Sequence, residues 1–159
     1  MSGETKFTDR MNEIEEKFNE YNKFLNLNLN INNEVNKYLN LDADSMKIMT
    51  AEDLSIAAAC ISRHSLFIQQ ETNKHIRIIN WIDANLKIIT SGQTEQYDKY
   101  LPFEEKRLLA IKGNDLTSKM LSSKVEHQMH ADHLNSLSYR IEFYSKTLSG
   151  IKDEKIRRK

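Results

Sequence analysis

Three histidines stand three residues apart in the segment His127-Gln-Met-His130-Ala-Asp-His133. Imidazole nitrogens are common ligands of zinc and other transition metals. At 100° per residue the three side chains spread over about 120° of a helix, so two could share a metal ion and three fit poorly. No second set of ligands stands out, and His127 and His130 fall on the apolar side of the predicted helix. We therefore expect histidines that pack against a neighbouring helix, and no metal site.

A thiol and an imidazole, Cys60 and His64, are four residues apart, which is the spacing of a thiol–imidazole pair on one helix. A nucleophile also needs an oxyanion site and a pocket, and positions inside a helix rarely supply them. The isolated glycines form no phosphate-binding loop. The acidic pair Glu104-Glu105 is typical of a helix start. The sequence therefore predicts a protein that is not an enzyme and needs no cofactor.

Basic and aromatic side chains occur close together between residues 97 and 112. This mixture suits single-stranded nucleic acid, because phosphates pair with cations and bases stack on rings such as Phe103. A solvated amphipathic helix offers similar cations, and that interpretation stays open. The residues predicted to contact nucleic acid are Lys87, Lys99, Lys106, Arg107, Lys112, Tyr97, Tyr100, Lys155, Arg157, Arg158 and Lys159.

The net charge of zero conceals an uneven distribution. Residues 1–53 hold six basic and eleven acidic side chains, whereas residues 54–159 hold 17 basic and 12 acidic ones. Five of the last eight residues are cations, which attract phosphate or, alternatively, form a solubilising disordered terminus. The single cysteine excludes a disulfide framework. No apolar run has the length of a membrane span, and residues 1–10 lack the apolar centre of a signal peptide, so we expect a cytoplasmic protein.

One proline and four glycines among 159 residues favour long helices over turn-rich strands. The first predicted helix has a weak middle, where the alternating stretch 25–31 leaves a short strand as an alternative. A connector is expected at 40–49. The apolar spacing of four and three that marks the first helix runs through Phe7, Met11, Ile14, Phe18, Tyr21 and Leu25.

The second predicted helix begins at a capping box, Thr50-Ala-Glu-Asp53, and ends near Thr90. After a loop, a third helix is predicted from Pro102 to about Ser149, with a kink at Gly113-Asn114. We call the row of residues with spacings of four and three along a helix its seam. The seam of the second helix consists of Leu54, Ala58, Ile61, Ser65, Ile68, Thr72, His75, Ile79, Ile82, Leu86 and Ile89. The seam of the third is Leu116, Met120, Ser123, His127, His130, Leu134, Leu137, Ile141, Tyr144, Leu148 and Ile151.

Extra apolar residues widen the stripe of the second helix beyond what one partner helix can cover. The sequence therefore predicts an all-α fold of three long helices in a coiled-coil-like homo-oligomer, with a monomeric three-helix bundle as the alternative. The expected divisions are an acidic arm and connector at 1–49, a helical hairpin at 50–151 and a basic tail at 152–159. The residues of the expected oligomer interface are Ile61, Ile68, Ile79, Trp81, Ile82, Leu134 and Ile141. For Trp81, the alternative is a position in the core of the single chain.

From about residue 53 onward, the order of short motifs resembles the UvsY family of phage recombination mediators. These motifs are Gln70-Glu71, Ser91-Gly92, Asp98-Lys99-Tyr100, Leu137-Ser138-Tyr139 and Leu148-Ser-Gly-Ile-Lys152. The resemblance implies a ring-like homo-oligomer that binds single-stranded DNA and helps a recombinase replace single-strand binding protein. The family carries a basic Leu-Lys-Ala-Arg element before the loop, whereas this chain has Asp83-Ala-Asn-Leu-Lys87, so DNA contact would be weaker or shifted.

Three functions remain open at this point. The leading hypothesis is a non-enzymatic single-stranded DNA-binding mediator that helps to load a recombinase. The alternative is a helical phage virion, scaffold or adaptor protein that acts through protein–protein contacts, with the acidic arm pairing with a partner helix. A third is a small effector that binds one host protein.

Overall fold

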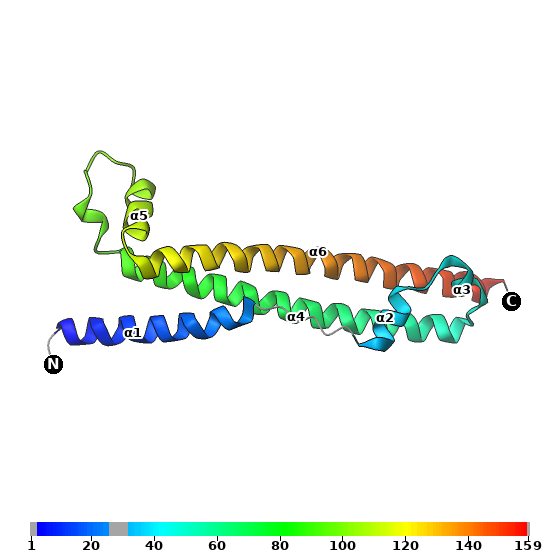
Figure 1. Ribbon diagram of the computed structural model, residues 1–159. Coiled ribbons are helices and arrows are strands. Elements are labelled where there is room, and N and C mark those ends of the chain that lie inside the picture. The colour runs from blue at the N-terminus through cyan, green and yellow to red at the C-terminus, as the bar shows by residue number, and fades with distance from the viewer. Residues whose placement is uncertain (1–2, 26–31, 159) are drawn as a thin grey trace. The chain divides into compact units, whose positions relative to one another are not determined.

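The computed structural model describes residues 3–25 and 32–158, and over these residues the chain is all-α, as predicted. No strand occurs in these two ranges. Residues 26–31, which form most of the stretch for which a short strand was the alternative, lie outside the described residues. The elements are α1 (Gly3–Asn22), a 3₁₀ turn η1 (Lys23–Leu25), α2 (Asn33–Leu39), α3 (Ala43–Ile48), α4 (Ala51–Thr90), a 3₁₀ turn η2 (Thr94–Gln96), α5 (Phe103–Lys112) and α6 (Asp115–Arg157) (Figure 1).

The chain forms two compact units, and α4 and α6 each contribute to both. Unit 1 consists of Met1–Leu27 and Lys74–His130. Unit 2 consists of residues 28–73 and 131–159. Within the described residues, none of the helices is both long and apolar enough to cross a membrane.

Unit 1 is built from α1, the second part of α4, α5 and the first part of α6 (Figure 1). Trp81 of α4 packs edge-on against Tyr21 of α1, with ring centroids 5.1 Å apart and planes at 83°. The side chain of Asn22 accepts a hydrogen bond from Ser123 of α6 at 2.7 Å. These contacts fix α1 to both long helices around a core formed by Ile14, Phe18, Ile78, Ile82, Leu86, Ile89, Ile111 and Met120.

In unit 2, small polar residues line the contact between α4 and α6. The hydroxyl oxygens of Ser65 and Ser138 lie 2.9 Å apart, and Ser145 donates to the carbonyl oxygen of Ala58 at 2.9 Å. All four residues are buried, so these serine hydroxyls find their partners inside the contact between the two helices. The short helix α2 joins the unit through Tyr38, whose carbonyl accepts from the hydroxyl of Tyr144.

The capping box at the start of α4 is confirmed. The backbone N–H of Asp53 donates to Thr50 Oγ1 at 3.1 Å, and the backbone N–H of Thr50 donates to the Asp53 carboxylate at 3.1 Å. The Thr50 hydroxyl also donates to the Asp53 carboxylate, at 2.7 Å, and this bond, followed by the one from the Thr50 backbone N–H, holds the pKa of Asp53 below its usual value. The eleven predicted seam residues of α4 are all buried. The predicted connector contains one helix more than expected, α3, which begins at an N-cap formed by Asp42.

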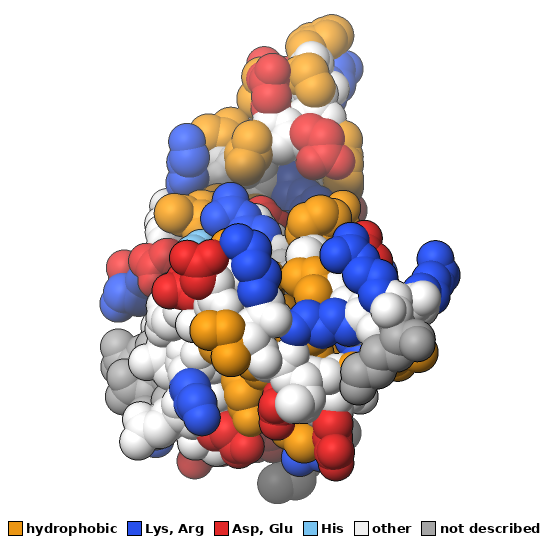
Figure 2. All heavy atoms as spheres, turned by 90° about the vertical axis from the view of Figure 1, so that its right-hand side faces the viewer, with side chains coloured by type: hydrophobic (Ala, Val, Ile, Leu, Met, Phe, Trp, Pro, Cys, Tyr) orange, Lys and Arg blue, Asp and Glu red, His pale blue; other side chains and the backbone are white. Residues whose placement is uncertain are grey.

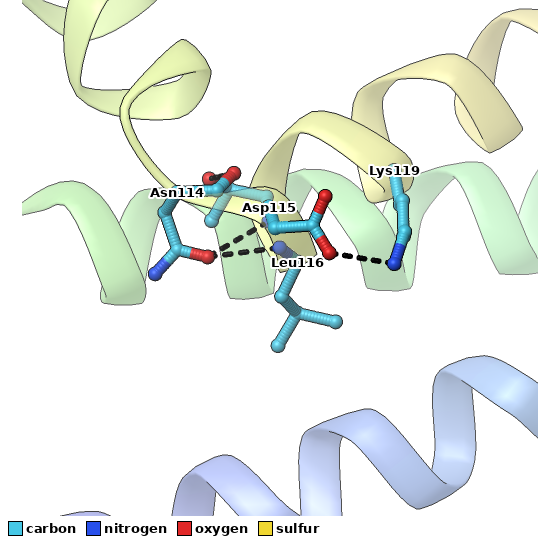
Figure 3. Close-up of polar contacts among 5 residues, drawn as sticks. Asn114, Asp115, Leu116 and Lys119 are labelled. Carbon is cyan, nitrogen blue, oxygen red and sulfur yellow. Dashed lines mark hydrogen bonds and ion pairs between the residues drawn. The ribbon is translucent and has the colours of Figure 1, made fainter.

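The predicted third helix is divided in two. Its first part is α5, which ends at Lys112, and its second part is α6, which starts at Asp115 and continues to Arg157. The side chain of Asn114 accepts from the backbone N–H groups of Leu116 and Thr117 at 2.9 and 3.4 Å (Figure 3). An N-cap at Asn114 requires a new helix start, so the expected kink is a complete break.

Most residues of the expected oligomer interface lie in the core of the single chain. Ile61, Ile68, Ile79, Ile82, Leu134 and Ile141 are buried within the single chain, and Trp81 is half-buried against Tyr21. Side chains that already fill the core of one chain have no free surface for a second copy. The large apolar residues of α4 that remain exposed all belong to the widened stripe; they are Ile56, Leu66, Phe67, Ile76 and Ile88.

Candidate nucleic-acid interface

The connection between α4 and α6 presents aromatic rings to solvent. Tyr100 is 84% exposed and Phe103, the first residue of α5, is 65% exposed. The ammonium group of Lys99 lies 5.3 Å from the centre of the Tyr100 ring, which is a cation–π contact. The Asp98 carboxylate accepts from the backbone N–H of Tyr100 at 3.0 Å, and this turn fixes the backbone that carries both residues. A cation and an exposed ring are thus held together in unit 1, and a second exposed ring, that of Phe103, follows three residues later.

Tyr97 has different surroundings from Tyr100, although the sequence predicts contact with nucleic acid for both residues. Its side chain is half-buried, and its hydroxyl would lie 3.6 Å from a Cβ atom added to Gly113. Tyr97 therefore reaches the end of α5 and holds the connection in place. Its ring is less available to a base than the rings of Tyr100 and Phe103.

The cations of α5 differ in their surroundings. Lys112 is exposed and Lys106 is half-buried, and neither has a carboxylate partner among the described residues. Arg107 is different, because its guanidinium lies 3.9 Å from Glu104 and its buried Nε has no hydrogen-bond partner in the described part of the chain. Lys87 is exposed in the last turn of α4. Lys99 is therefore the cation of this region that the structure places against a ring, and Lys106 and Lys112 are the lysines of α5.

Carboxylates balance the charge of this region. The segment 91–113 contains four basic and four acidic side chains. Its helix, α5, packs through Ala110 and Ile111 and leaves Leu108 and Leu109 exposed, two apolar residues that the sequence analysis did not select. The region consequently exposes aromatic and apolar side chains together with several lysines, and its net charge is zero.

The predicted C-terminal cations belong to unit 2. Lys155 donates to the carbonyl oxygens of Lys47 and Met49 at 2.6 and 2.5 Å, and so caps the end of α3. Arg158 lies 3.7 Å from Glu154. Arg157 is exposed, and Lys159 lies outside the described residues. Figure 2, which looks at the end of the molecule that carries the C-terminus, shows lysine and arginine side chains beside acidic ones.

The segment Asp83–Lys87, which stands where the UvsY family carries its basic element, is held by two interactions. Asp83 forms an ion pair with Lys124 of α6 at 2.8 Å, and Asn85 donates to the carbonyl oxygen of Trp81 at 2.8 Å. Both interactions serve the packing of unit 1. Of the five residues Asp83–Lys87, only Lys87 is a cation, and it points to solvent at the end of α4.

The histidines and the thiol differ in their surroundings. His127 and His75 meet across α4 and α6, whereas His133 is exposed. Burial raises the pKa of the Cys60 thiol and lowers that of the His64 imidazole, which opposes a thiolate–imidazolium pair. In the described part of the chain no group of three or more His, Cys, Asp or Glu side chains could hold a metal ion.

Comparison with known proteins gives no relative. No protein-family model, no curated protein and no solved structure matches this chain.

Proposed function

We propose that this protein binds single-stranded DNA without catalysing a reaction, through a surface formed by Lys99, Tyr100, Phe103, Lys106 and Lys112. We call this the aromatic–lysine surface. The observation that carries the proposal is the exposure of two rings, Tyr100 and Phe103, in a segment where Lys99 lies over the Tyr100 ring and has no described carboxylate partner.

Binding at this surface would combine stacking with local charge. A base stacked on an aromatic side chain contributes about 1–3 kcal/mol, and it does so for every base because each has a π-face. The lysines would neutralise neighbouring phosphates. Because acidic residues balance the charge of the segment 91–113, stacking would supply more of the affinity than in a strongly basic groove. Sequence-independent binding of this kind suits an accessory protein that coats a strand.

The role in recombination rests on the resemblance to the UvsY family. In that role the protein would form a homo-oligomer and help a recombinase to displace single-strand binding protein. Several copies on one strand would add avidity to the modest affinity of a single surface. Exposed apolar residues of α4, among them Leu66 and Phe67, support association between copies.

The test is a titration of a fluorescein-labelled oligo(dT) strand followed by fluorescence anisotropy. We expect Tyr100→Ala to weaken binding about tenfold, because one stacked base is lost. Tyr139→Ala is the matched control, since Tyr139 is an exposed tyrosine on α6 outside the surface, and its affinity should equal that of the wild type. Loss of affinity that is equal in both variants would contradict the assignment of the surface.

A salt series adds a second measurement. If Lys99, Lys106 and Lys112 each neutralise one phosphate, the logarithm of the association constant should fall with the logarithm of salt concentration with a slope of about −2 per protomer. No binding at low salt, or binding without salt dependence, would contradict DNA binding at this surface.

A second function has a specific observation in its favour. The exposed apolar residues Leu108 and Leu109 on α5, together with the balanced charge around them, also suit a helical partner protein. The protein would then be a virion, scaffold or adaptor component. Co-purification with a particle, together with indifference to oligonucleotides, would favour this function over the first.

A further inference from the structure

Two buried imidazoles face each other inside unit 1. The Nδ1 atoms of His75 on α4 and His127 on α6 lie 2.7 Å apart, and the ring centroids are 5.0 Å apart. His75 is 2% exposed and His127 is fully buried. His130, one turn further along α6, stacks on the His75 ring with a centroid distance of 5.4 Å. Three imidazoles thus share one layer of the contact between the two helices.

A short contact between two ring nitrogens requires one proton between them. One imidazole donates from Nδ1 and the other accepts at Nδ1, so the pair is complete when both rings are neutral. The Nε2 atom of His127 is buried and has no hydrogen-bond partner among the described residues. An orphaned buried N–H is less well tolerated than an orphaned acceptor, so His127 fits best as the donor from Nδ1 with a bare Nε2.

An additional proton has no favourable position in this arrangement. On His127 it would occupy Nε2, where a buried N–H and a positive charge would both lack a partner. On His75 it would occupy Nδ1 and oppose the proton already donated by His127. We propose that the His75–His127 pair is an acid-sensitive contact, and that its protonation breaks the packing of α4 against α6 in unit 1. This inference is independent of the proposed function.

The electrostatics of His127 act in the same direction. Burial, followed by the neighbouring His75 and His130, lowers the pKa of His127 from 6.5 to about 4. A proton therefore binds the unfolded chain more readily than the folded one between these values. The contribution of His127 to stability is complete above about pH 6.5, falls as the pH falls, and is lost below about pH 4.

The other charged groups near the pair come from three elements. On α6, Lys124 is already paired with Asp83. On α4, the neighbours along the helix are Glu71 and Lys74, both of which have partners of their own. On the 3₁₀ turn η1, Lys23 is the residue after Asn22, whose side chain accepts from Ser123 one turn before His127. Glu126 directly precedes His127 on α6 and is exposed. The groups that act on the charge of His127 are the two histidines, His75 and His130.

The experiment is urea unfolding between pH 7.5 and 4.5, followed by the fluorescence of Trp81, which is the single tryptophan and lies in unit 1. On acidification, the unfolding constant of the wild type should rise on the order of a hundredfold more than that of His127→Gln. His133→Gln is the matched control, because His133 is exposed on the same helix, and it should follow the wild type. This difference between variants removes the contributions of carboxylates and of His64.

Equal pH dependence in the wild type and His127→Gln would overturn the proposal, as would a wild type whose stability does not change with pH. If His127→Gln fails to fold, imidazole NMR of the wild type decides. A hydrogen-bonded Nδ1 proton that disappears together with the native Trp81 signal on acidification supports the proposal. An imidazole pair that takes up protons while unit 1 stays folded overturns it.

Discussion

The ion pair between Lys124 and Asp83 joins α6 to α4 in unit 1 at 2.8 Å, and the two side chains are 30% and 34% exposed. Partial burial weakens the screening by water, so this pair should matter more than an ordinary surface pair. We expect a double-mutant cycle of Lys124→Met and Asp83→Asn to give a coupling energy of about 1 kcal/mol. Urea unfolding followed by Trp81 fluorescence measures it.

The chain provides a matched control for that cycle. Lys119 and Asp115, on the same helix in the same unit, lie 2.6 Å apart but are 64% and 83% exposed. Their coupling should be within experimental error, despite the shorter distance. A coupling for the exposed pair that equals or exceeds that of Lys124 and Asp83 would show that contact distance, and not burial, sets the strength.

At the scale of single residues, the sequence predicts the composition of the candidate site better than its geometry. It selects Lys99 and Tyr100, which lie together in an exposed cation–π contact. It gives Tyr97 equal weight, although that side chain turns toward the end of α5. Side-chain direction in a loop follows from turn geometry and tertiary contacts, for which a single sequence carries no periodic pattern.

Asn114 is the residue that separates α5 from α6, because its side chain accepts from the first backbone N–H groups of α6 (Figure 3). Replacing an N-cap asparagine with alanine costs about 1 kcal/mol. We therefore expect Asn114→Ala to lower the free energy of unfolding by about that amount in urea titrations, and Asn114→Asp to retain it. Asn135→Ala, at an exposed position within α6, should not destabilise the protein. Equal stability of Asn114→Ala and the wild type would contradict the capping role.

At the scale of helices, apolar spacing was sufficient to predict which face of α4 is buried. Each seam position from Leu54 to Ile89 is buried, including the polar Ser65 and Thr72. The same spacing runs from Leu116 to Ile151 on α6 with buried or half-buried residues throughout. The end of α5 was harder to predict, because a cap depends on one side chain and its local hydrogen bonds, while the apolar spacing continues on either side.

At the scale of the units, most residues of the predicted interface lie in the core of a single chain. Seam residues such as Ile68 and Leu134 are fully buried within the single chain, so they have no surface left for a second copy. Apolar spacing identifies residues that must be covered, but it does not identify whether the covering helix comes from the same chain. The surplus side chains of the widened stripe are therefore the better candidates for association.

The last prediction concerns association between copies of the chain. Leu66 and Phe67 are adjacent exposed apolar residues on α4 in unit 2, while the next residue, Ile68, is fully buried. Covering a large apolar side chain contributes about 1.5–3 kcal/mol, so the double variant Leu66→Lys/Phe67→Lys should weaken self-association on the order of a hundredfold or more. Sedimentation equilibrium over a concentration series measures the change. Gln69→Lys/Gln70→Lys adds the same charge at two exposed positions of the same helix and should retain the wild-type mass. A wild type that sediments as a monomer at every concentration would contradict association, and an unchanged mass of the Leu66/Phe67 variant would place the contact elsewhere.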